Sequence, residues 1–320
     1  MISRRSALLV LFFLFSLISA SCREQLAPPS SSPTTPSTHP TQPRLVVLSP
    51  ALAVTLTDLS LAHLIVGRHG YDLALDPAIP VCGDQSGIDY EALIRANPTD
   101  VLIEWGARPL PARLEELAKV NRWNIRNFTL LTLDDIRTST EELWRAYATL
   151  NLAKAESPRA RLDQAWSART PPLAAAGRVL LLLSASPPAA LGPGSFHHQI
   201  LTAIGGTPAL TSGSPYIELD AEDVLKLDPD VIVFVISRAT TAQPRAAKAP
   251  LTDEEIATLL GPLSKVNLRA ARDRNIVLLD DPFALLPSTA MARLADQLAH
   301  KLADQLAGSL KPRDNAPGPH

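Results

Sequence analysis

The sequence is poor in cysteine and in aromatic residues, and it has neither an excess of basic residues nor, after its N-terminal region, a long apolar run. Its 320 residues include two cysteines, Cys22 and Cys82, and aromatic side chains make up 5% of the chain. Basic residues are not in excess, because 30 Lys and Arg stand against 32 Asp and Glu, and they form no run, so nucleic-acid binding is not expected. Beyond the N-terminal region no segment has enough uninterrupted apolar residues to predict a membrane span.

The first 22 residues have the features of an export signal. Arg4 and Arg5 precede an apolar run from Ala7 to Ile18, which is too short to span a bilayer comfortably. Small residues then lead to Cys22, and this arrangement resembles a bacterial lipobox. We therefore expect a signal peptide over 1–21 and an exported protein that is lipid-anchored to a membrane through Cys22. An ordinary signal peptide with an incidental cysteine is the alternative.

Residues 23–43 are rich in Pro, Ser and Thr. Such a segment cannot bury enough apolar surface to fold, so an extended tether is expected. Removal of the signal peptide takes away two arginines and changes the formal net charge from −2 to −4. Once Cys22 is lipidated only Cys82 remains, so no intramolecular disulfide is expected, and Cys82 is interpreted as a small buried residue.

Strand and helix patterns alternate through the body of the chain. The runs RLVVL (44–48) and RVLLLLS (178–184) predict strands, and each begins an alternating series. Helix–strand alternation favours mainly parallel sheets with helices on both faces. We therefore expect an α/β fold with two doubly wound lobes.

Several helix boundaries are also marked. Ser49 followed by Pro50 predicts an N-cap and a first helical residue. Thr252 and Glu255 have the spacing of a capping box. A further helical pattern runs from about 133 to 168 and is interrupted by a proline.

One phrase occurs twice, once in each series. The copies are IDYEALIRANPTDVLIEW (88–105) and LDAEDVLKLDPDVIVFV (219–235). Each contains an Asp placed to cap a helix, a Glu two positions later, Asn-Pro or Asp-Pro to stop the helix, and then a strand. The glutamates, Glu91 and Glu222, would lie in the first helical turn, where a negative charge suits the helix dipole. Capping alone could explain either copy, but the presence of two copies indicates a symmetric partner that contacts both.

Taken in order, these segments resemble the periplasmic substrate-binding proteins of ABC importers for cobalamin, haem and ferric siderophores. The resemblance extends over nearly all of 44–306 and includes SPALAVTLTDLSLAHLIVGRHGYD, both copies of the phrase, GSFHHQILTAIGG and NIVLLDDPFALLPSTAMARLADQLA. It implies two α/β lobes joined by one long helix, with the ligand in the cleft between them. In that family an acidic residue at the Glu position of each phrase engages basic residues on the two membrane subunits. Glu91 and Glu222 are thus the expected transporter-docking residues.

Composition and resemblance together predict six segments. They are a signal peptide (1–21), a lipidated cysteine with its tether (22–43), an N-terminal α/β lobe (44–138), an interlobe helix region (139–170), a C-terminal α/β lobe (171–310) and a disordered tail (311–320).

In detail the resemblance is to the cobalamin-binding group. Tyr71, Trp105, Tyr216 and Phe283 fall where that group has aromatic or ligand-contacting residues, and Asp281 falls where it has a polar contact. Aromatic side chains offer rigid apolar area that suits a flat corrin or porphyrin ring, although each could instead fill a core. Two departures count against cobalamin. Gln85 stands where that group often has a Trp, and Ala189 stands where it has a Phe.

The resemblance implies a non-enzyme that carries a transported ligand and no resident cofactor or metal. The ligand would be a corrinoid such as cobalamin, or alternatively a haem or a ferric siderophore. The implied partners are an ABC permease and its ATPase, and we expect a monomer.

Other chemistry stays open. His69, His197 and His198 could bind a metal ion directly, as in zinc- or manganese-binding relatives, and His69 or His197 could be an axial ligand of haem. No familiar motif indicates a nucleophile or an acid–base pair, but the same scaffold also serves metal chelatases, so an enzyme remains an alternative. A surface adhesion or scaffolding lipoprotein would keep the anchor and need no aromatic-lined cleft.

Overall fold

The computed structural model describes residues 42–147, 157–237 and 250–309. The expected lipidation site Cys22, the signal peptide, nearly all of the tether and the C-terminal tail lie outside these ranges. Within the described ranges no helix is both long and apolar enough to cross a membrane.

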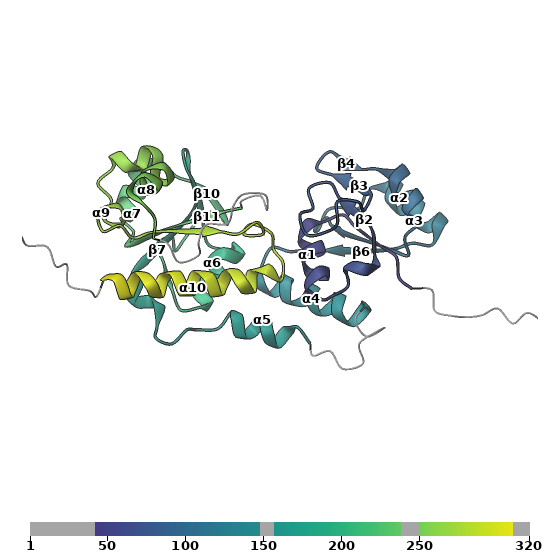
Figure 1. Ribbon diagram of the computed structural model, residues 1–320. Helices are drawn as coiled ribbons and strands as arrows, with labels where there is room; N and C mark the ends of the chain where they lie inside the picture. Colours follow the sequence, from purple (N-terminus) through teal and green to yellow (C-terminus); the bar gives the residue numbers. More distant parts are fainter. Residues whose placement is uncertain (1–41, 148–156, 238–249, 310–320) are drawn as a thin grey trace, which may run out of the picture. The chain divides into compact units, whose positions relative to one another are not determined.

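The first sheet is built from the N-terminal part of the body (Figure 1). Its strands are β1 (Leu45–Val47), β2 (Ile65–His69), β3 (Val81–Asp84), β4 (Gly87–Ile88), β5 (Asp100–Glu104) and β6 (Asn124–Phe128). Their order is β4-β3-β2-β1-β5-β6, and every pairing is parallel except that of β3 with β4. The associated helices are α1 (Pro50–Asp58), α2 (Tyr90–Ala96), α3 (Ala112–Asn121) and α4 (Leu133–Tyr147), with a 3-10 turn at Ala62–Leu64.

The second sheet follows from residue 178 onward. Its strands are β7 (Arg178–Ala185), β8 (Pro188–Leu191), β9 (Thr207–Pro208), β10 (Tyr216–Glu218), β11 (Val231–Ile236) and β12 (Ile276–Asp280). The order is β10-β8-β7-β11-β12 with β9 on β7, and β8 runs antiparallel to both of its neighbours. The helices are α5 (Arg159–Ala165), α6 (Phe196–Ala203), α7 (Ala221–Leu227), α8 (Asp253–Leu260), α9 (Arg269–Arg272) and α10 (Ala290–Ser309), with 3-10 turns at Leu173–Ala176 and Gly261–Lys265.

Both faces of each sheet are buried, as a parallel sheet requires. In β11, Val233 packs in a cluster with residues of α6 and α10, whereas its neighbour Phe234 packs in another cluster with residues of α7 and α8. In β1, Leu45 packs with α1 and α4, whereas Val46 packs with α2 and α3. The predicted α/β fold with two mainly parallel, doubly wound sheets is confirmed.

Local signals in the sequence also mark helix starts correctly. The Ser49 hydroxyl accepts a hydrogen bond from Leu52 N at the start of α1. Thr252 and Glu255 form the predicted capping box of α8. The predicted interlobe helix region is described only in part, because α4 ends at Tyr147 and α5 begins at Arg159.

Several hydrogen bonds join the first series of elements to the second, among them one from Arg137 Nε of α4 to Asp163 of α5 at 2.7 Å. Leu133 N, at the start of α4, donates to the Gln199 side chain of α6 at 2.9 Å. The Thr289 hydroxyl, just before α10, donates to Asp58 at the end of α1 at 2.5 Å. Val54 of α1 also lies in the apolar cluster of α6 and α10.

Candidate functional site: two repeated helices and two sheet edges

The repeated phrase folds in the same way in both places. Asp89 caps α2 by accepting hydrogen bonds from Glu91 N and Ala92 N, and Asp220 caps α7 by accepting from Asp223 N. Both helices have seven residues, and each ends on a left-handed residue before the proline, with φ of 44° at Asn97 and 36° at Asp228. The sequence repetition is therefore a structural repetition.

Glu91 and Glu222 project from these helices into solvent. Their side chains are 85% and 82% exposed, respectively. Each has a weak partner one turn along its own helix, with Glu91 at 3.7 Å from Arg95 and Glu222 at 3.9 Å from Lys226. Exposed pairs of this kind contribute only a few tenths of a kcal/mol, so both carboxylates can exchange their partners for those of another molecule.

The carboxyl edge of the first sheet contains a point where the strand order reverses. The chain passes from β1 to β2 on one side and places β5 on the other side of β1. Open α/β sheets bind ligands outside the carboxyl ends of their strands at such a point. Here Ser49 follows β1 and Glu104 ends β5, and the Ser49 hydroxyl donates to Glu104 Oε2 at 2.7 Å.

Glu104 was not singled out in the sequence, and its environment is unusual. Burial raises the pKa of its carboxyl group, and the hydrogen bond from Ser49 lowers it in part. A carboxylate has capacity for several hydrogen bonds, so Glu104 can accept donors from a ligand above this edge. Its position directly before Trp105 was the available signal, since the end of a parallel strand is where such residues gather.

The two expected ligand residues of the first lobe lie on loops after strands. Trp105 follows β5 and is partly buried, with its indole N–H donated to Pro109 O at 2.8 Å and the Arg108 guanidinium over its ring at 4.4 Å. Tyr71 follows β2 and is 61% exposed, with its ring centroid 5.8 Å from that of His69. Tyr71 thus has a free face, whereas Trp105 also packs against its own lobe.

The three expected ligand residues of the second lobe differ from one another. Tyr216 lies on the edge strand β10 and is 51% exposed. Phe283 follows β12 and packs in part against the core.

Asp281, also after β12, is buried beside Arg293, with the Asp281 Oδ2 to Arg293 Nε distance at 3.0 Å. Burial acts to raise the pKa of Asp281, but the hydrogen bonds from Arg293 and Phe283 N outweigh it, so the pKa is lowered overall. Asp281 is therefore an ionised carboxylate already held by its own lobe.

The histidines occupy distinct environments. His197 is 4% exposed, and burial lowers its pKa to about 4, although its contact with Ala284 O at 2.7 Å acts to raise it. In this structure its ring therefore lies inside the lobe, away from solvent. His198 Nε2 contacts Leu210 O at 3.1 Å, and half-buried His69 has a lowered pKa because of burial. Among the described residues, no group of three His, Cys, Asp or Glu side chains could hold a metal ion.

The two departures from the cobalamin-binding pattern also have a place in the structure. Ala189 is 4% exposed within β8, and Gln85 is exposed in the turn between β3 and β4. Ala189 therefore fills the sheet, and Gln85 stays available to a ligand or partner.

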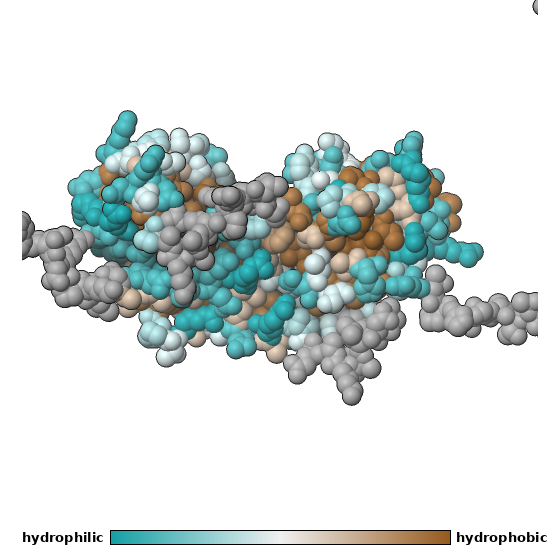
Figure 2. Space-filling view, viewed as in Figure 1, coloured by the Kyte–Doolittle hydropathy of each residue, from teal (hydrophilic) through white to brown (hydrophobic). Residues whose placement is uncertain are grey.

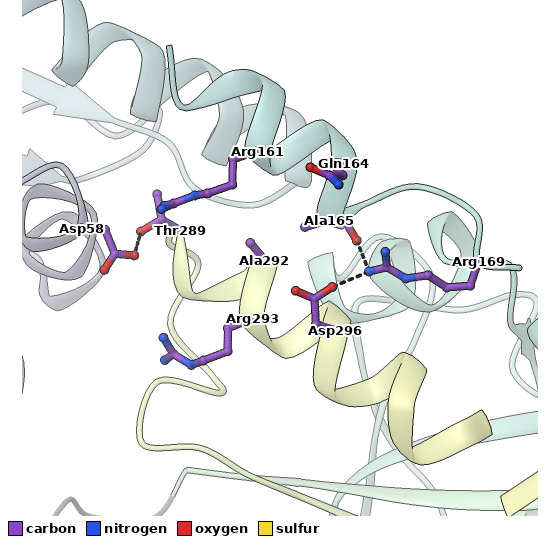
Figure 3. A pocket seen from close by; sticks show the side chains of 9 residues that line it. All are labelled: Asp58, Arg161, Gln164, Ala165, Arg169, Thr289, Ala292, Arg293 and Asp296. Atoms are coloured by element: carbon purple, nitrogen blue, oxygen red, sulfur yellow. Dashed lines mark hydrogen bonds and ion pairs between the residues drawn. The ribbon is translucent and has the colours of Figure 1, made fainter. Parts of the chain in front are cut away.

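A polar pocket of about 430 Å³ lies where α1 ends and where α5 and α10 run close together (Figure 3). Asp296 accepts from Arg169 at 2.7 Å, and Asp58 accepts from Thr289. The guanidinium of Arg293 is engaged by Asp281 outside the pocket. Because most of these charges already have partners and none of the expected aromatic residues lines it, we do not assign the ligand to this pocket.

Apolar surface is concentrated over the N-terminal lobe in Figure 2. The large apolar or aromatic side chains exposed in that lobe include Tyr71, Leu73 and Val81. Tyr71 and Leu73 follow β2, and Val81 begins β3. One of the expected ligand residues, Tyr71, is thus among the exposed large side chains of this lobe.

No protein-family model matches the chain, and no curated protein matches its sequence. Solved structures do match. The periplasmic haem-binding protein HutB of Vibrio cholerae is 16% identical with a TM-score of 0.63, covering 81% of this chain and 98% of that one.

Two further structures give the same result. The periplasmic vitamin B12-binding protein BtuF of Vibrio cholerae is 19% identical with a TM-score of 0.58, covering 82% and 97% of the two chains. The haem-binding protein BhuT, solved with two haems, is 20% identical with a TM-score of 0.60, covering 83% and 99%. These structures are periplasmic binding proteins of the kind that the sequence resembles. That the ligand is cobalamin in preference to haem stays a prediction. At this level of identity the likeness establishes the fold, which is that of the periplasmic haem- and vitamin B12-binding proteins.

Proposed function

We propose that this chain is a membrane-anchored substrate-binding lipoprotein of an ABC importer. It would capture a corrinoid such as cobalamin, or alternatively a haem or ferric siderophore, between its lobes and deliver it to a permease with its ATPase. The observation that carries the proposal is the match over nearly the full length of binding proteins whose ligands are haem and vitamin B12.

The ligand would contact the carboxyl edges of the two sheets. Tyr71 and Tyr216 offer exposed aromatic faces, and Trp105 and Phe283 offer partly exposed ones. Rigid aromatic faces suit a flat macrocycle, and the carboxyl groups of Glu104 and Asp281 suit hydrogen-bond donors, such as amide substituents, around its rim. No catalytic role is proposed for any of these residues.

The anchor is proposed from the sequence alone. Acylation at Cys22 would hold the body close to a membrane, and stable anchoring needs more than one acyl chain. Mass spectrometry of the mature N-terminus tests this directly, and a Cys22→Ser variant should lose the lipid. A mature N-terminus elsewhere and without lipid would contradict the anchor and leave the binding proposal standing.

The binding proposal is tested with the mature protein purified in detergent. Calorimetric titration with cyanocobalamin, haemin and a ferric hydroxamate should show binding of one of them, with one ligand per chain expected. Trp105→Ala and Tyr216→Ala should each weaken that binding by about 1–3 kcal/mol if the ring packs flat on the ligand. Val120→Ala, at an exposed residue of α3, is the control and should leave affinity unchanged.

The outcomes separate the alternatives. Unchanged affinity in both aromatic variants would mean that the ligand lies elsewhere. Failure of the wild-type protein to bind any of the three ligands would overturn the proposal and favour an enzyme of the chelatase type or an adhesion lipoprotein.

A further inference from the structure

The outward faces of α2 and α7 match at more positions than the glutamates. Three residues after each Glu comes an exposed apolar residue, Ile94 at 45% and Leu225 at 44% exposure. The next residue is basic in both copies, and the side chains of Arg95 and Lys226 are 70% and 71% exposed. Acid, apolar and basic groups thus recur at equal spacing and nearly equal exposure.

Packing explains the inner faces of these helices and not their outer faces. Leu93 and Val224 hold equivalent positions and are both fully buried, because any helix on a sheet needs an apolar inner face. Ile94 and Leu225 at the outer positions are buried only in part, so a large share of each apolar side chain stays in contact with solvent after folding. A single exposed apolar residue is ordinary, but a branched apolar residue beside equivalent charges at the same position of both helices indicates a shared use.

The geometry points to a two-copy docking surface whose apolar residues, Ile94 and Leu225, form its energetic centre. The partner is a pair of similar membrane subunits of an importer, each offering an apolar contact beside an Arg or Lys. This inference rests on the proposed function. It adds to the glutamates the residues that hold the complex together.

The three groups have different tasks in such a surface. Residues one turn apart on a helix lie side by side, so each apolar side chain lies between the carboxylate and the helix end. Rim charges chiefly speed association and select the partner, whereas burial of the apolar group slows dissociation. Arg95 and Lys226 pair only weakly with the Glu side chains, so the cation of the partner can replace them.

The test measures uptake in cells of the source organism whose own gene is replaced by variants. The probe is radiolabelled cyanocobalamin or haemin, whichever the wild-type protein binds. Ile94→Ser and Leu225→Ser should each raise the level of protein needed for half-maximal uptake by about tenfold, and the double variant should raise it further. Ligand affinity should stay at the wild-type value, and the melting temperature should fall by only a few degrees, because each side chain is partly buried.

Val120→Ser is the matched control. Val120 is 73% exposed on α3 of the same lobe as Ile94 but lies outside the repeated phrase, and its variant should import at the wild-type level. Normal uptake by the double variant Ile94→Ser with Leu225→Ser would overturn the inference, as would a defect confined to one of the two single variants. Absence of probe binding and uptake in the wild type would instead overturn the proposed function itself.

Discussion

The two copies of the repeated phrase share an outer face and differ in how they are held in place. At the end of α2, the Arg44 side chain donates to backbone carbonyls, at 2.7 Å to Ala96 O and at 3.1 Å to Asn97 O. At the end of α7, Arg269 instead pairs with two carboxylates, those of Asp228 at 2.7 Å and Asp230 at 2.6 Å. The residues that hold the helix ends in place therefore differ between the two copies, whereas the exposed residues are of the same type in both.

The starts of the two helices show the same contrast. Asp89 receives two backbone N–H groups by itself, whereas Asp220 shares a reciprocal capping box with Asp223. The capping Asp and the left-handed residue before Pro are common to both copies, so capping explains part of the repetition but not the exposed groups between the caps. We therefore assign folding to the inner and terminal residues and propose recognition for the outer ones.

The largest expected effect comes from the inner faces. Leu93→Ala should lower the free energy of unfolding by about 2–5 kcal/mol, because it leaves a cavity between α2 and the sheet. Val224→Ala should cost less, since it removes fewer methyl groups at about 0.8 kcal/mol each before the cavity is counted. Urea unfolding measures both, and a loss below about 0.5 kcal/mol in each would contradict the division of roles.

Lowering the pH should reveal a second difference between the lobes, since among the described residues only the second lobe contains a buried histidine. The folded-state pKa of His197 is about 4, below its ordinary value of 6.5. The folded protein therefore favours the neutral ring. This contribution to stability is complete above pH 6.5 and falls by about 1.4 kcal/mol per pH unit as the pH drops from 6.5 toward 4.

A His197→Gln variant isolates that effect. Gln can still donate to the Ala284 carbonyl but does not titrate. Between pH 7 and pH 5, wild-type stability should fall by about 2 kcal/mol more than that of the variant. Equal pH slopes in urea titrations would show that His197 is protonated without cost in the folded state.

Removal of the caps should have a moderate and similar effect on both helices. Asp89→Ala and Asp220→Ala should each cost about 0.5–2 kcal/mol, because backbone N–H groups lose their acceptor. The Asp→Asn variants keep a side-chain oxygen and should cost less. Denaturant midpoints would check this, and a wild-type midpoint for both alanine variants would mean that the caps are dispensable.

Local rules predicted the parts of the fold that depend on neighbouring residues. Ser49 and the pair Thr252 and Glu255 marked helix starts because capping acts within one turn. The short strands β3, β4, β8 and β10 were not predicted. Each has two to four residues. β3, β4 and β8 contain glycine, proline or alanine, and all four depend on pairing with a neighbouring strand, which no pattern within the segment itself reports.

Some residues of the candidate site could likewise be predicted from a local sequence pattern, and others could not. Glu91 and Glu222 were found from a repeated phrase, and their exposure agrees with the predicted docking role without testing it. The contact between Ser49 and Glu104 spans 55 positions in sequence and depends on β1 and β5 being neighbours. A position inside a lobe, such as that of His197, likewise follows from packing and not from helix periodicity alone.

Substitution of Glu91 and Glu222 is expected to have the smallest effect on stability and the largest effect on delivery of the ligand. Exposed charges of this kind change stability by less than about 0.5 kcal/mol. The double variant Glu91→Lys with Glu222→Lys should therefore keep its stability and its ligand affinity, but repel the cations of a permease. Glu116→Lys with Glu254→Lys, at exposed residues of α3 and α8, makes the same charge change away from the phrase and serves as the control.

The decisive measurement is ligand uptake by cells that carry these two double variants at equal protein levels, with melting temperatures recorded on the same proteins. The account predicts that Glu91→Lys with Glu222→Lys loses most uptake at a wild-type melting temperature, while the control imports normally. Wild-type uptake by the Glu91 and Glu222 variant, accompanied by a lower melting temperature, would show that the repeated phrase serves only to cap helices.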